Sequence, residues 1–509
     1  MNFRSLRPGK PHLLCFLLGP VSACGFAPLG LWPLTLAAFG GFLWMVREAD
    51  GLRAALARGW WFGLGQFVLG LNWIATAFTY QAAMPAWLGW IAVVLLSLYL
   101  AVYPAIAAGL AWGLGRRSGM AFALLFGAAW IISEWLRATM FTGFAWNPLG
   151  VIWVGTPLAM VARFIGTYGL SGLSVALVGA AVPLAEAARR RKLTRAAVAT
   201  LAIAATALIL LPLAVRSQPG NDAGRPLIRI VQPNIGQEDK YSAELAARNF
   251  ARLAALSGQP GAEPRLLMWP EAAVLDYIEE EPWTRARLAS LLGPRDMLLT
   301  GGTALEYDPT GHVVAARNSL FAIDFFARIL GRYDKAHLVP YGEYLPMRPI
   351  LSAIGLSRLA PGDLDFWPGP GAETLAVPGF GKVGIQICYE IIFSGQVVDR
   401  ANRPAFLFNP SNDAWFGAWG PPQHLAQARL RAIEEGLPVI RSTPTGISAL
   451  IDADGRLIAH LPWRKAGAID ARLPRAAAPT PFARYGNVLP LLLAGLLALL
   501  AFAPRIKAR

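Results

Sequence analysis

The chain has 509 residues, of which 55% are hydrophobic and only 15% are charged, whereas charged residues make up about 25% of an ordinary soluble domain. This balance argues against a soluble single-domain protein. The formal net charge is +15, but residues 217–487 carry 27 Lys and Arg against 27 Asp and Glu, so the whole excess lies in the apolar remainder. This distribution favours a membrane protein over one that binds nucleic acid.

Eight apolar segments have the length of transmembrane helices, since a bilayer core of about 30 Å needs about 20 helical residues. We expect spans at roughly 11–28, 29–46, 58–78, 86–113, 119–136, 159–184, 196–215 and 488–504. The first two are short and separate at Pro28 and Gly30. We keep them apart because merging them would break the alternation of charge along the chain.

Basic residues gather on alternate connections between these spans. They are Arg4, Arg7 and Lys10; Arg47, Arg53 and Arg58; Arg116 and Arg117; Arg189, Arg190, Arg191, Lys192 and Arg195; and Arg505, Lys507 and Arg509. The other connections carry almost no basic residues, apart from Arg137 and Arg163 around the start of the sixth span. By the positive-inside rule, both termini are cytoplasmic and the insert between spans seven and eight faces outward.

The N-terminal segment allows two interpretations. Its basic residues, apolar run and Val-Ser-Ala-Cys-Gly at 21–25 are typical of a secretory signal with a lipoprotein-type cleavage site. The same residues also fit an uncleaved first span that carries Cys24 on its apolar face. We adopt the second interpretation because further apolar spans follow directly.

The insert alternates short β-rich runs with helical stretches, which is typical of one α/β domain. The runs are 227–232, 266–269, 297–300, 319–323, 383–387, 405–408 and 439–443, and the helical stretches include 243–256 and 424–435. The predicted domains are a membrane domain at 1–219 with seven transmembrane helices, an α/β domain at 220–480, and a C-terminal transmembrane helix with a cytoplasmic tail at 481–509.

Three polar blocks at the ends of apolar runs each have an ordinary structural explanation beside a chemical one. Glu271 follows one run, and exposed glutamates after strands are common. Residues 332–343 contain Lys335 and also fit a solvated loop. Residues 384–390 carry Cys388, the only cysteine of the insert, and a lone buried cysteine usually packs as a small hydrophobe.

Together the blocks supply what nucleophilic catalysis by a thiol requires. A thiol with an ordinary pKa of about 8.5 needs an adjacent base or cation to attack at neutral pH. Glu271 and Lys335 provide both, and a fixed ammonium also stabilises the charge on an attacked carbonyl oxygen. A chemical role would explain a single thiol in an oxidising compartment, where no disulfide partner is available.

This order of Glu, Lys and Cys-Tyr-Glu resembles the nitrilase superfamily, over essentially the whole insert. The resemblance implies an αββα sandwich with a catalytic triad. Glu271 would be general base and then acid, Lys335 would stabilise the tetrahedral intermediate, and Cys388 would form a thioester. The residues with an implied supporting role are Glu343, which would orient the lysine and the base, and Tyr389 and Glu390, which flank the nucleophile.

With its membrane segments, the chain resembles the apolipoprotein N-acyltransferase family. The matching segments outside the triad are 134–137, 143–146, 232–235, 318–319 and 411–417. Two residues depart from the family pattern: Ala145 stands where proline is frequent, and Tyr241 stands where tryptophan is usual. The resemblance suggests substrate contacts at Arg137, Trp146, Tyr241, Asn318 and Trp415. Arg137 would contact a lipid phosphate, although an arginine at the end of a span also commonly snorkels to the headgroups.

The implied reaction is a ping-pong acyl transfer in the bacterial inner membrane, with the catalytic domain in the periplasm. The acyl donor would be a phospholipid, expected to be phosphatidylethanolamine, and the acceptor a diacylated apolipoprotein. We expect no cofactor, no metal site and no nucleic-acid partner, since the histidines lack ligand spacing. Two alternatives remain: a membrane-tethered amidase or other nitrilase-like hydrolase, and a non-enzymatic transporter or lipid-binding scaffold.

Overall fold

The computed structural model describes residues 10–80, 85–116, 118–189, 222–353 and 365–506. The chain divides into two compact units. The first comprises Met1–Trp73, Trp90–Arg216 and Thr480–Arg509, and the second comprises Ile74–Gly89 and Ser217–Pro479. Residues 74–89, which the sequence analysis assigned to the membrane domain, therefore group with the second unit. The exact ends of the predicted domains stay a prediction.

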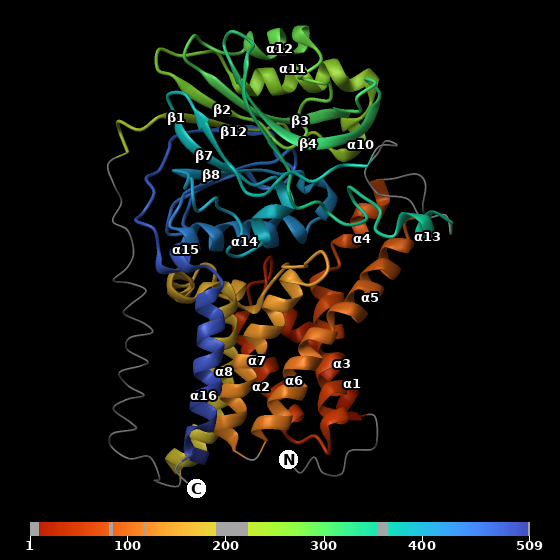
Figure 1. Cartoon of the computed structure of the whole chain (residues 1–509), viewed down its shortest axis with the longest axis vertical. Helices are drawn as coiled ribbons and strands as arrows, with labels where there is room; N and C mark the ends of the chain where they lie inside the picture. The colour runs from red at the N-terminus through yellow and green to blue at the C-terminus, as the bar shows by residue number, and fades with distance from the viewer. Residues whose placement is uncertain (1–9, 81–84, 117, 190–221, 354–364, 507–509) are drawn as a thin grey trace. The chain divides into compact units, whose positions relative to one another are not determined.

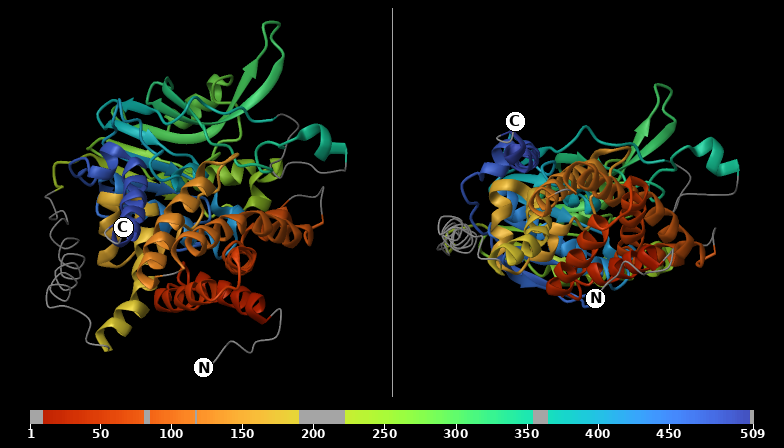
Figure 2. Two further views of the ribbon diagram at one scale, coloured as in Figure 1. Left: turned by 60° about the horizontal axis from the view of Figure 1, so that its bottom comes forward. Right: turned by 90° about the horizontal axis from the view of Figure 1, so that it is seen from below.

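The first unit is helical, and the second begins with two short helices. The first unit contains α1 (Lys10–Ala23), α2 (Trp32–Arg47), α3 (Leu52–Gly70), most of α5 (Leu88–Leu100), α6 (Val102–Gly115), α7 (Gly119–Thr139), η3 (Leu149–Trp153), η4 (Pro157–Val161), α8 (Ala162–Arg189), α15 (Pro481–Tyr485) and α16 (Val488–Ile506). The short helices that begin the second unit are α4 (Ile74–Ala77) and η2 (Phe78–Tyr80). α16 packs against α7 and α8, although it lies far from them in the sequence (Figure 2).

The break between the first two helices lies where the sequence predicted it, between Ala23 and Trp32. Gly30 has a φ of 65°, and a proline at position 28 cannot donate a helical hydrogen bond. Two short helices therefore form in place of one long one.

Eight membrane spans are not confirmed. Among the described residues, Leu88–Gly115, Gly119–Thr139 and Pro157–Ala181 are long and apolar enough to cross a membrane. A fourth is added if Leu52–Gly70 and Ile74–Tyr80, bent by 49°, count as one span. α1 and α2 have 14 and 16 residues, below the 20 or so that a bilayer needs. The predicted seventh span, 196–215, lies outside the described residues.

The second unit contains two sheets of six strands each. The strands are β1 (Leu227–Gln232), β2 (Arg265–Met268), β3 (Met297–Tyr307), β4 (Val313–Asp324), β5 (Ile329–Asp334), β6 (Thr374–Val377), β7 (Gly381–Ile385), β8 (Phe406–Pro410), β9 (Val439–Ser442), β10 (Ala449–Ile451), β11 (Leu457–His460) and β12 (Gly467–Arg472). One sheet has the order β12-β1-β2-β3-β4-β5 and the other β11-β10-β9-β8-β7-β6. β1-β2-β3 and β7-β8-β9 pair in parallel, and the flanking pairs are antiparallel.

Helices cover the outer face of each sheet (Figure 1). The remaining helices of the unit are α10 (Gln237–Lys240), η5 (Ala243–Leu245), α11 (Ala246–Ser257), α12 (Pro282–Ala289), α13 (Arg348–Ala353), η6 (Cys388–Ile392), η7 (Asp413–Phe416) and α14 (Gly420–Glu435). α11 and α12 pack on the first sheet and α14 on the second, while β1 faces β9 between the layers. This arrangement confirms the predicted αββα sandwich.

The apolar residues predicted as strands form the core of the first layer. Val231, Trp269 and Phe321 are fully buried against Leu253 of α11 and Leu288 of α12. β3 and β4 are longer than predicted and form a hairpin that extends beyond the rest of the sheet (Figure 2). The polar blocks of the sequence lie at the ends of β2, β5 and β7.

Candidate active site

Glu271 lies on the turn that follows β2. Its backbone passes so close to Gly301 of β3 that a Cβ atom at position 301 would lie 2.8 Å from the Glu271 Cα. A glycine is therefore required there, because any side chain would displace the turn. The Glu271 carboxylate is 7% exposed, and its Oε2 accepts a 2.6 Å hydrogen bond from the Asn412 backbone N–H.

Lys335 follows β5 and is held through its backbone on both sides. Its N–H donates to the Asn318 carbonyl at 2.9 Å, and its own carbonyl accepts from the Gly369 N–H at 2.9 Å. The side chain is 1% exposed, so the ammonium group is removed from bulk water. A buried ammonium needs charged partners, and the site provides two carboxylates.

We call Glu271, Asn318, Lys335 and Glu343 the lysine cluster. Lys335 Nζ lies 2.9 Å from Glu343 Oε1 and 3.7 Å from Glu271 Oε1. Asn318 Nδ2 donates to both carboxylates, at 2.7 Å to Glu271 and 2.8 Å to Glu343. Burial alone would lower the pKa of Lys335, but Glu343, Glu271 and Cys388 outweigh it, so its pKa is raised and the ammonium stays charged.

Cys388 opens η6 directly after the turn that follows β7. It is 5% exposed and has a φ of 50°, in the left-handed region that few residues other than glycine adopt. Burial raises the pKa of the Cys388 thiol, Glu271 raises it further, and Lys335 lowers it. The thiol is therefore neutral at rest and lies within the electrostatic reach of a base and a cation. The structure thus brings the three predicted triad residues together.

Glu390 connects the turn before Cys388 to the backbone after Lys335 through hydrogen bonds. Its Oε1 accepts hydrogen bonds from the Ala336 and His337 N–H groups at 2.7 and 3.0 Å, and its Oε2 accepts from Ile387 N–H at 2.7 Å. The Tyr333 hydroxyl donates to both oxygens. Burial raises the pKa of Glu390 to about 7, against the lowering effect of these donors and of Lys335. Glu390 therefore acts on the backbone that positions the reacting groups.

Three further aromatic residues named in the sequence analysis, Tyr389, Trp415 and Tyr241, lie in this unit. The Tyr389 ring packs edge-on against Phe393, with ring centroids 5.2 Å apart. Trp415 lies edge-on to Tyr80 at 5.8 Å, so the segment after α4 contacts the loop that holds Asn412. Tyr241 is 47% exposed, with Lys240 Nζ 5.6 Å from its ring.

Arg137 and Trp146 lie together in the first unit, whereas the triad residues belong to the second. Arg137 is 3% exposed, and its Nη1 donates to the Trp146 carbonyl at 2.8 Å. A buried guanidinium does not extend to lipid headgroups, which argues against the snorkelling interpretation. A contact with substrate at either residue stays a prediction.

Residues that the sequence analysis gave no role also contact the site. Asn412 holds Glu271 through its backbone, and its side-chain Nδ2 donates to Gln237 Oε1 at 2.9 Å. His424 and Asn409 both donate to the Cys388 carbonyl. A signal was present for Asn412, since residues 409–413 form another polar block after an apolar run. His424 gave no such signal, because it lies inside a helix.

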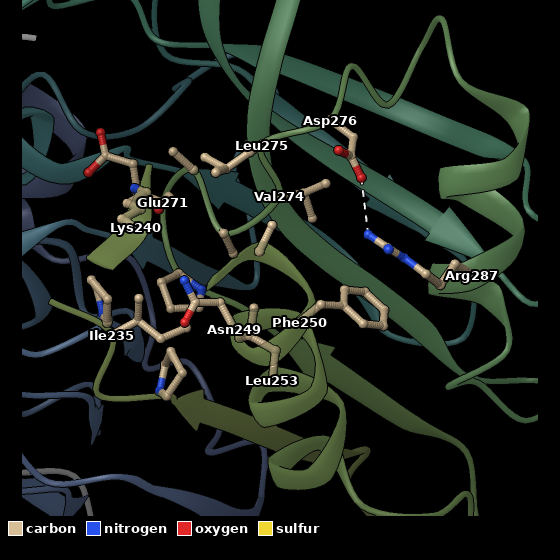
Figure 3. Close-up of a pocket in the computed structure, with 16 residues that line it drawn as sticks. Ile235, Lys240, Asn249, Phe250, Leu253, Glu271, Val274, Leu275, Asp276 and Arg287 are labelled. Carbon is tan, nitrogen blue, oxygen red and sulfur yellow. Dashed lines mark hydrogen bonds and ion pairs between the residues drawn. The ribbon is translucent and has the colours of Figure 1, made fainter. Parts of the chain in front are cut away.

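A cavity of about 70 Å³ lies behind the turn that carries Glu271. Apolar side chains of α11 and of residues 272–275 form most of its lining, and the Asp276–Arg287 ion pair lies at one side (Figure 3). Figure 3 shows the Glu271 carboxylate directed away from the apolar lining. The carboxylate therefore acts on the opposite side, toward Lys335 and Cys388.

Comparisons with known proteins match the whole chain. Residues 18–181 match the model of the apolipoprotein N-acyltransferase N-terminal domain, and residues 227–479 match that of the carbon-nitrogen hydrolases. A Bradyrhizobium diazoefficiens protein named apolipoprotein N-acyltransferase is 36% identical over 516 residues, which cover 98% of this chain and 96% of that protein. A Caulobacter vibrioides protein of the same name is 36% identical over 502 residues and covers 95% and 92%.

Among solved structures, Saccharomyces cerevisiae Nit3, a member of branch 10 of the nitrilase superfamily, is 20% identical with a TM-score of 0.35. The match covers 49% of this chain and 90% of that one.

Proposed function

Since this chain belongs to the apolipoprotein N-acyltransferase family, we propose that it moves an acyl chain from a membrane phospholipid to the N-terminal α-amine of a diacylglyceryl-modified lipoprotein. The family makes the chain an acyltransferase with lipid and lipoprotein substrates. The proposal adds the donor, the thioester and the roles of the residues. The observation that supports it most is the buried Cys388 within electrostatic reach of Glu271 and Lys335.

The first half-reaction forms a thioester on Cys388. Because the thiol is neutral at rest, Glu271 takes its proton as Sγ attacks the ester carbonyl of the phospholipid. The Lys335 ammonium stabilises the oxyanion of the tetrahedral intermediate. When the intermediate collapses, the ester C–O bond breaks and the proton on Glu271 passes to the leaving alkoxide. A lysophospholipid departs, and the acyl group stays on sulfur.

The second half-reaction transfers the acyl group to nitrogen. The lipoprotein amine attacks the thioester, Glu271 accepts a proton from the amine, and the proton returns to the leaving thiolate. Asn318 fits this step because its Nδ2 is bonded to both carboxylates while its buried Oδ1 has no hydrogen-bond partner among the described residues. The Oδ1 atom can therefore accept an N–H of the incoming amine.

Glu343 and Glu390 support these steps without reacting. Glu343 accepts from Lys335 and also from the Val339 N–H at 2.8 Å, so it fixes the ammonium in one place. Glu390 holds the backbone at Ala336 and Ile387, on the two sides of the site. Preorganised charges of this kind lower a barrier because they need no reorganisation during the reaction.

A membrane location suits both substrates, because each buried CH₂ of an acyl chain contributes about 0.8 kcal/mol to membrane anchoring. We therefore place the enzyme in the bacterial inner membrane with both termini cytoplasmic and the catalytic domain periplasmic. The expected donor is phosphatidylethanolamine. The residues proposed to contact lipid substrates are Arg137, Trp146, Tyr241 and Trp415. The charge alternation of the sequence supports this orientation.

The test uses full-length protein in nanodiscs that contain phosphatidylethanolamine with a labelled acyl chain. Without acceptor, mass spectrometry should find the acyl group on the Cys388 peptide, and addition of a diacylated lipopeptide should move it to the peptide N-terminus. Cys388→Ala should give neither product. Free fatty acid with no N-acylated peptide would contradict the transferase and indicate a hydrolase. Unchanged transfer by Cys388→Ala would exclude the thioester.

A further inference from the structure

Four polar side chains meet behind the cysteine turn, and we call them the histidine cluster. They are Asn409 of β8, Asp413 of η7, His424 of α14 and Arg441 of β9. All four are 0% exposed. Burial of charged groups is unfavourable unless each is paired, so such a cluster needs an explanation in terms of what it holds in place.

The cluster converges on the backbone of Cys388. His424 Nε2 lies 3.0 Å from the Cys388 carbonyl oxygen, and Asn409 Nδ2 donates to the same oxygen at 3.2 Å. Asn409 Nδ2 also donates to the Gln386 carbonyl at 2.5 Å. The Gln386–Ile387 and Cys388–Tyr389 peptide groups are therefore both held by side chains from other elements.

Cys388 needs this support because its backbone is left-handed. For a residue with a Cβ atom, that conformation costs roughly 1–2 kcal/mol. It persists only where the surrounding contacts determine it, and such strain is concentrated at functional sites. The carbonyl of Cys388 is the atom through which the histidine cluster acts on this conformation.

The contacts also define the protonation of His424. A carbonyl oxygen only accepts, so Nε2 must carry a hydrogen and donate to it. Nδ1 lies 3.0 Å from both Asp413 Oδ1 and Arg441 Nη2. Burial and Arg441 lower the pKa of His424 against the raising effect of Asp413, so the ring is neutral and its Nδ1 accepts from Arg441. Arg441, which is itself paired with Asp413, thereby orients the ring toward Cys388.

We propose that His424 is a positioning residue for the nucleophile: through its Nε2–H bond to the Cys388 carbonyl, it holds the left-handed turn that directs the sulfur toward Glu271 and Lys335. The part that concerns catalysis rests on the proposed function of Cys388. The effect on the reactivity of the thiol does not depend on the identity of the substrate.

Two variants that differ by one methylene group test the bond. In His424→Gln, the amide N–H extends to about the place of Nε2, so the donor to the Cys388 carbonyl is kept. In His424→Asn, the amide reaches only the level of Nδ1, so the donor is lost while the contact with Asp413 remains possible. Gln427→Asn is the control, because Gln427 is 1% exposed on the same helix and donates to the Gln423 carbonyl.

Two rates are measured on the full-length protein: alkylation of Cys388 by iodoacetamide and acylation of Cys388 by phospholipid. His424→Asn should slow both by roughly 100-fold with little change in KM, because small misplacement of a reacting atom has effects of that size. His424→Gln should recover most of the rate, and Gln427→Asn should keep it. Should His424→Asn not fold, His424→Leu supplies the loss variant.

The inference is overturned if Cys388 reacts as slowly in His424→Gln as in His424→Asn. It is also overturned if folded His424→Asn or His424→Leu reacts at the rate of the unsubstituted protein. Slowing of the same size in Gln427→Asn would also overturn it, because the effect would then belong to helix stability. If the unsubstituted protein forms no acyl adduct, the proposed function fails, whereas the alkylation rates still decide this inference.

Discussion

The lysine cluster and the histidine cluster are two buried groups of charges next to the same cysteine, and they differ in the kind of atom that is left without a hydrogen-bond partner. In the lysine cluster, one ammonium is shared by two carboxylates, and Asn318 Oδ1 has no partner among the described residues. In the histidine cluster, the Asp413 carboxylate accepts from Ser411 at 2.7 Å and from Arg441, and the atom without a hydrogen-bond partner among the described residues is a donor, Arg441 Nε.

The difference indicates that the two clusters have different roles. A group that must bind substrate and exchange protons needs an atom left for the substrate and a carboxylate that can change its charge. A group that only holds the backbone needs no acceptor for a substrate, and its buried carboxylate must stay paired, because an unpaired buried charge is costly. Changes in the lysine cluster should therefore reduce the rate more than the stability, whereas loss of the buried carboxylate of the histidine cluster should reduce the stability more than the rate.

The largest expected effect is on the rate of Glu271→Gln. The amide cannot take a proton, so kcat should fall roughly 10²–10⁴-fold, the usual contribution of general base catalysis. The free energy of unfolding should fall by only about 1–2 kcal/mol, because the amide still accepts from one of its two neighbouring N–H donors. Transfer assays and chemical denaturation measure the two quantities. A rate within a factor of about two of the original would remove Glu271 from the mechanism.

Asp413→Asn should act mainly on stability. It leaves Arg441 buried without its carboxylate, and loss of one partner of a buried pair typically costs about 3–5 kcal/mol. Asp276→Asn is the control, since the Asp276–Arg287 pair is partly exposed and such pairs contribute at most about 1 kcal/mol. Denaturation followed by tryptophan fluorescence compares the two. Equal losses would mean that the histidine cluster does not stabilise the fold.

A third expected effect concerns pH and Glu390. An unfolded glutamate has a pKa of about 4.3, and the folded value is about 7, so the folded state binds the additional proton between these values. Stability should therefore be greatest at low pH and decline until about pH 7, above which it is level.

Tyr333→Phe sharpens this test. The variant removes a hydroxyl that donates to both Glu390 oxygens at 2.9 and 3.0 Å, and this bond lowers the pKa of Glu390. The end of the decline should therefore move to higher pH, with a loss of about 1 kcal/mol at neutral pH. Denaturation at a series of pH values measures both. An end point that stays in place would exclude Glu390 as the titrating group.

The α/β character of the second unit and the polar blocks at its strand ends could be predicted because their signals are local, whereas the αββα sandwich was predicted from the resemblance to the nitrilase superfamily. An apolar run that ends in a polar turn marks the end of a strand, and β1 lies at the predicted residues 227–232. β5 was missed and its end was interpreted as part of a polar loop. β5 is an edge strand, and Arg332 pairs on its polar face with Glu306 and Glu279. The charged residues of β5 therefore gave it the sequence pattern of a loop.

The contacts of His424 could not be predicted, because its partners come from three separate elements: η6, η7 and β9. His424 lies 36 residues after Cys388, inside a helix that is buried on nearly all sides. A single polar residue in such a helix carries no pattern. The number of spans is unconfirmed for a different reason: composition and charge mark apolar segments, but α1 and α2, whose segments are already short in the sequence, form helices of only 14 and 16 described residues.

Glu390 has a consequence for when the enzyme becomes reactive. Its carboxylate joins the turn after β7, in one sheet, to the strand end after β5, in the other. Neither layer alone contains both the sulfur and its ammonium partner. On the proposed mechanism, a newly made chain with one layer assembled therefore carries an inert thiol, which becomes reactive only when the two layers close.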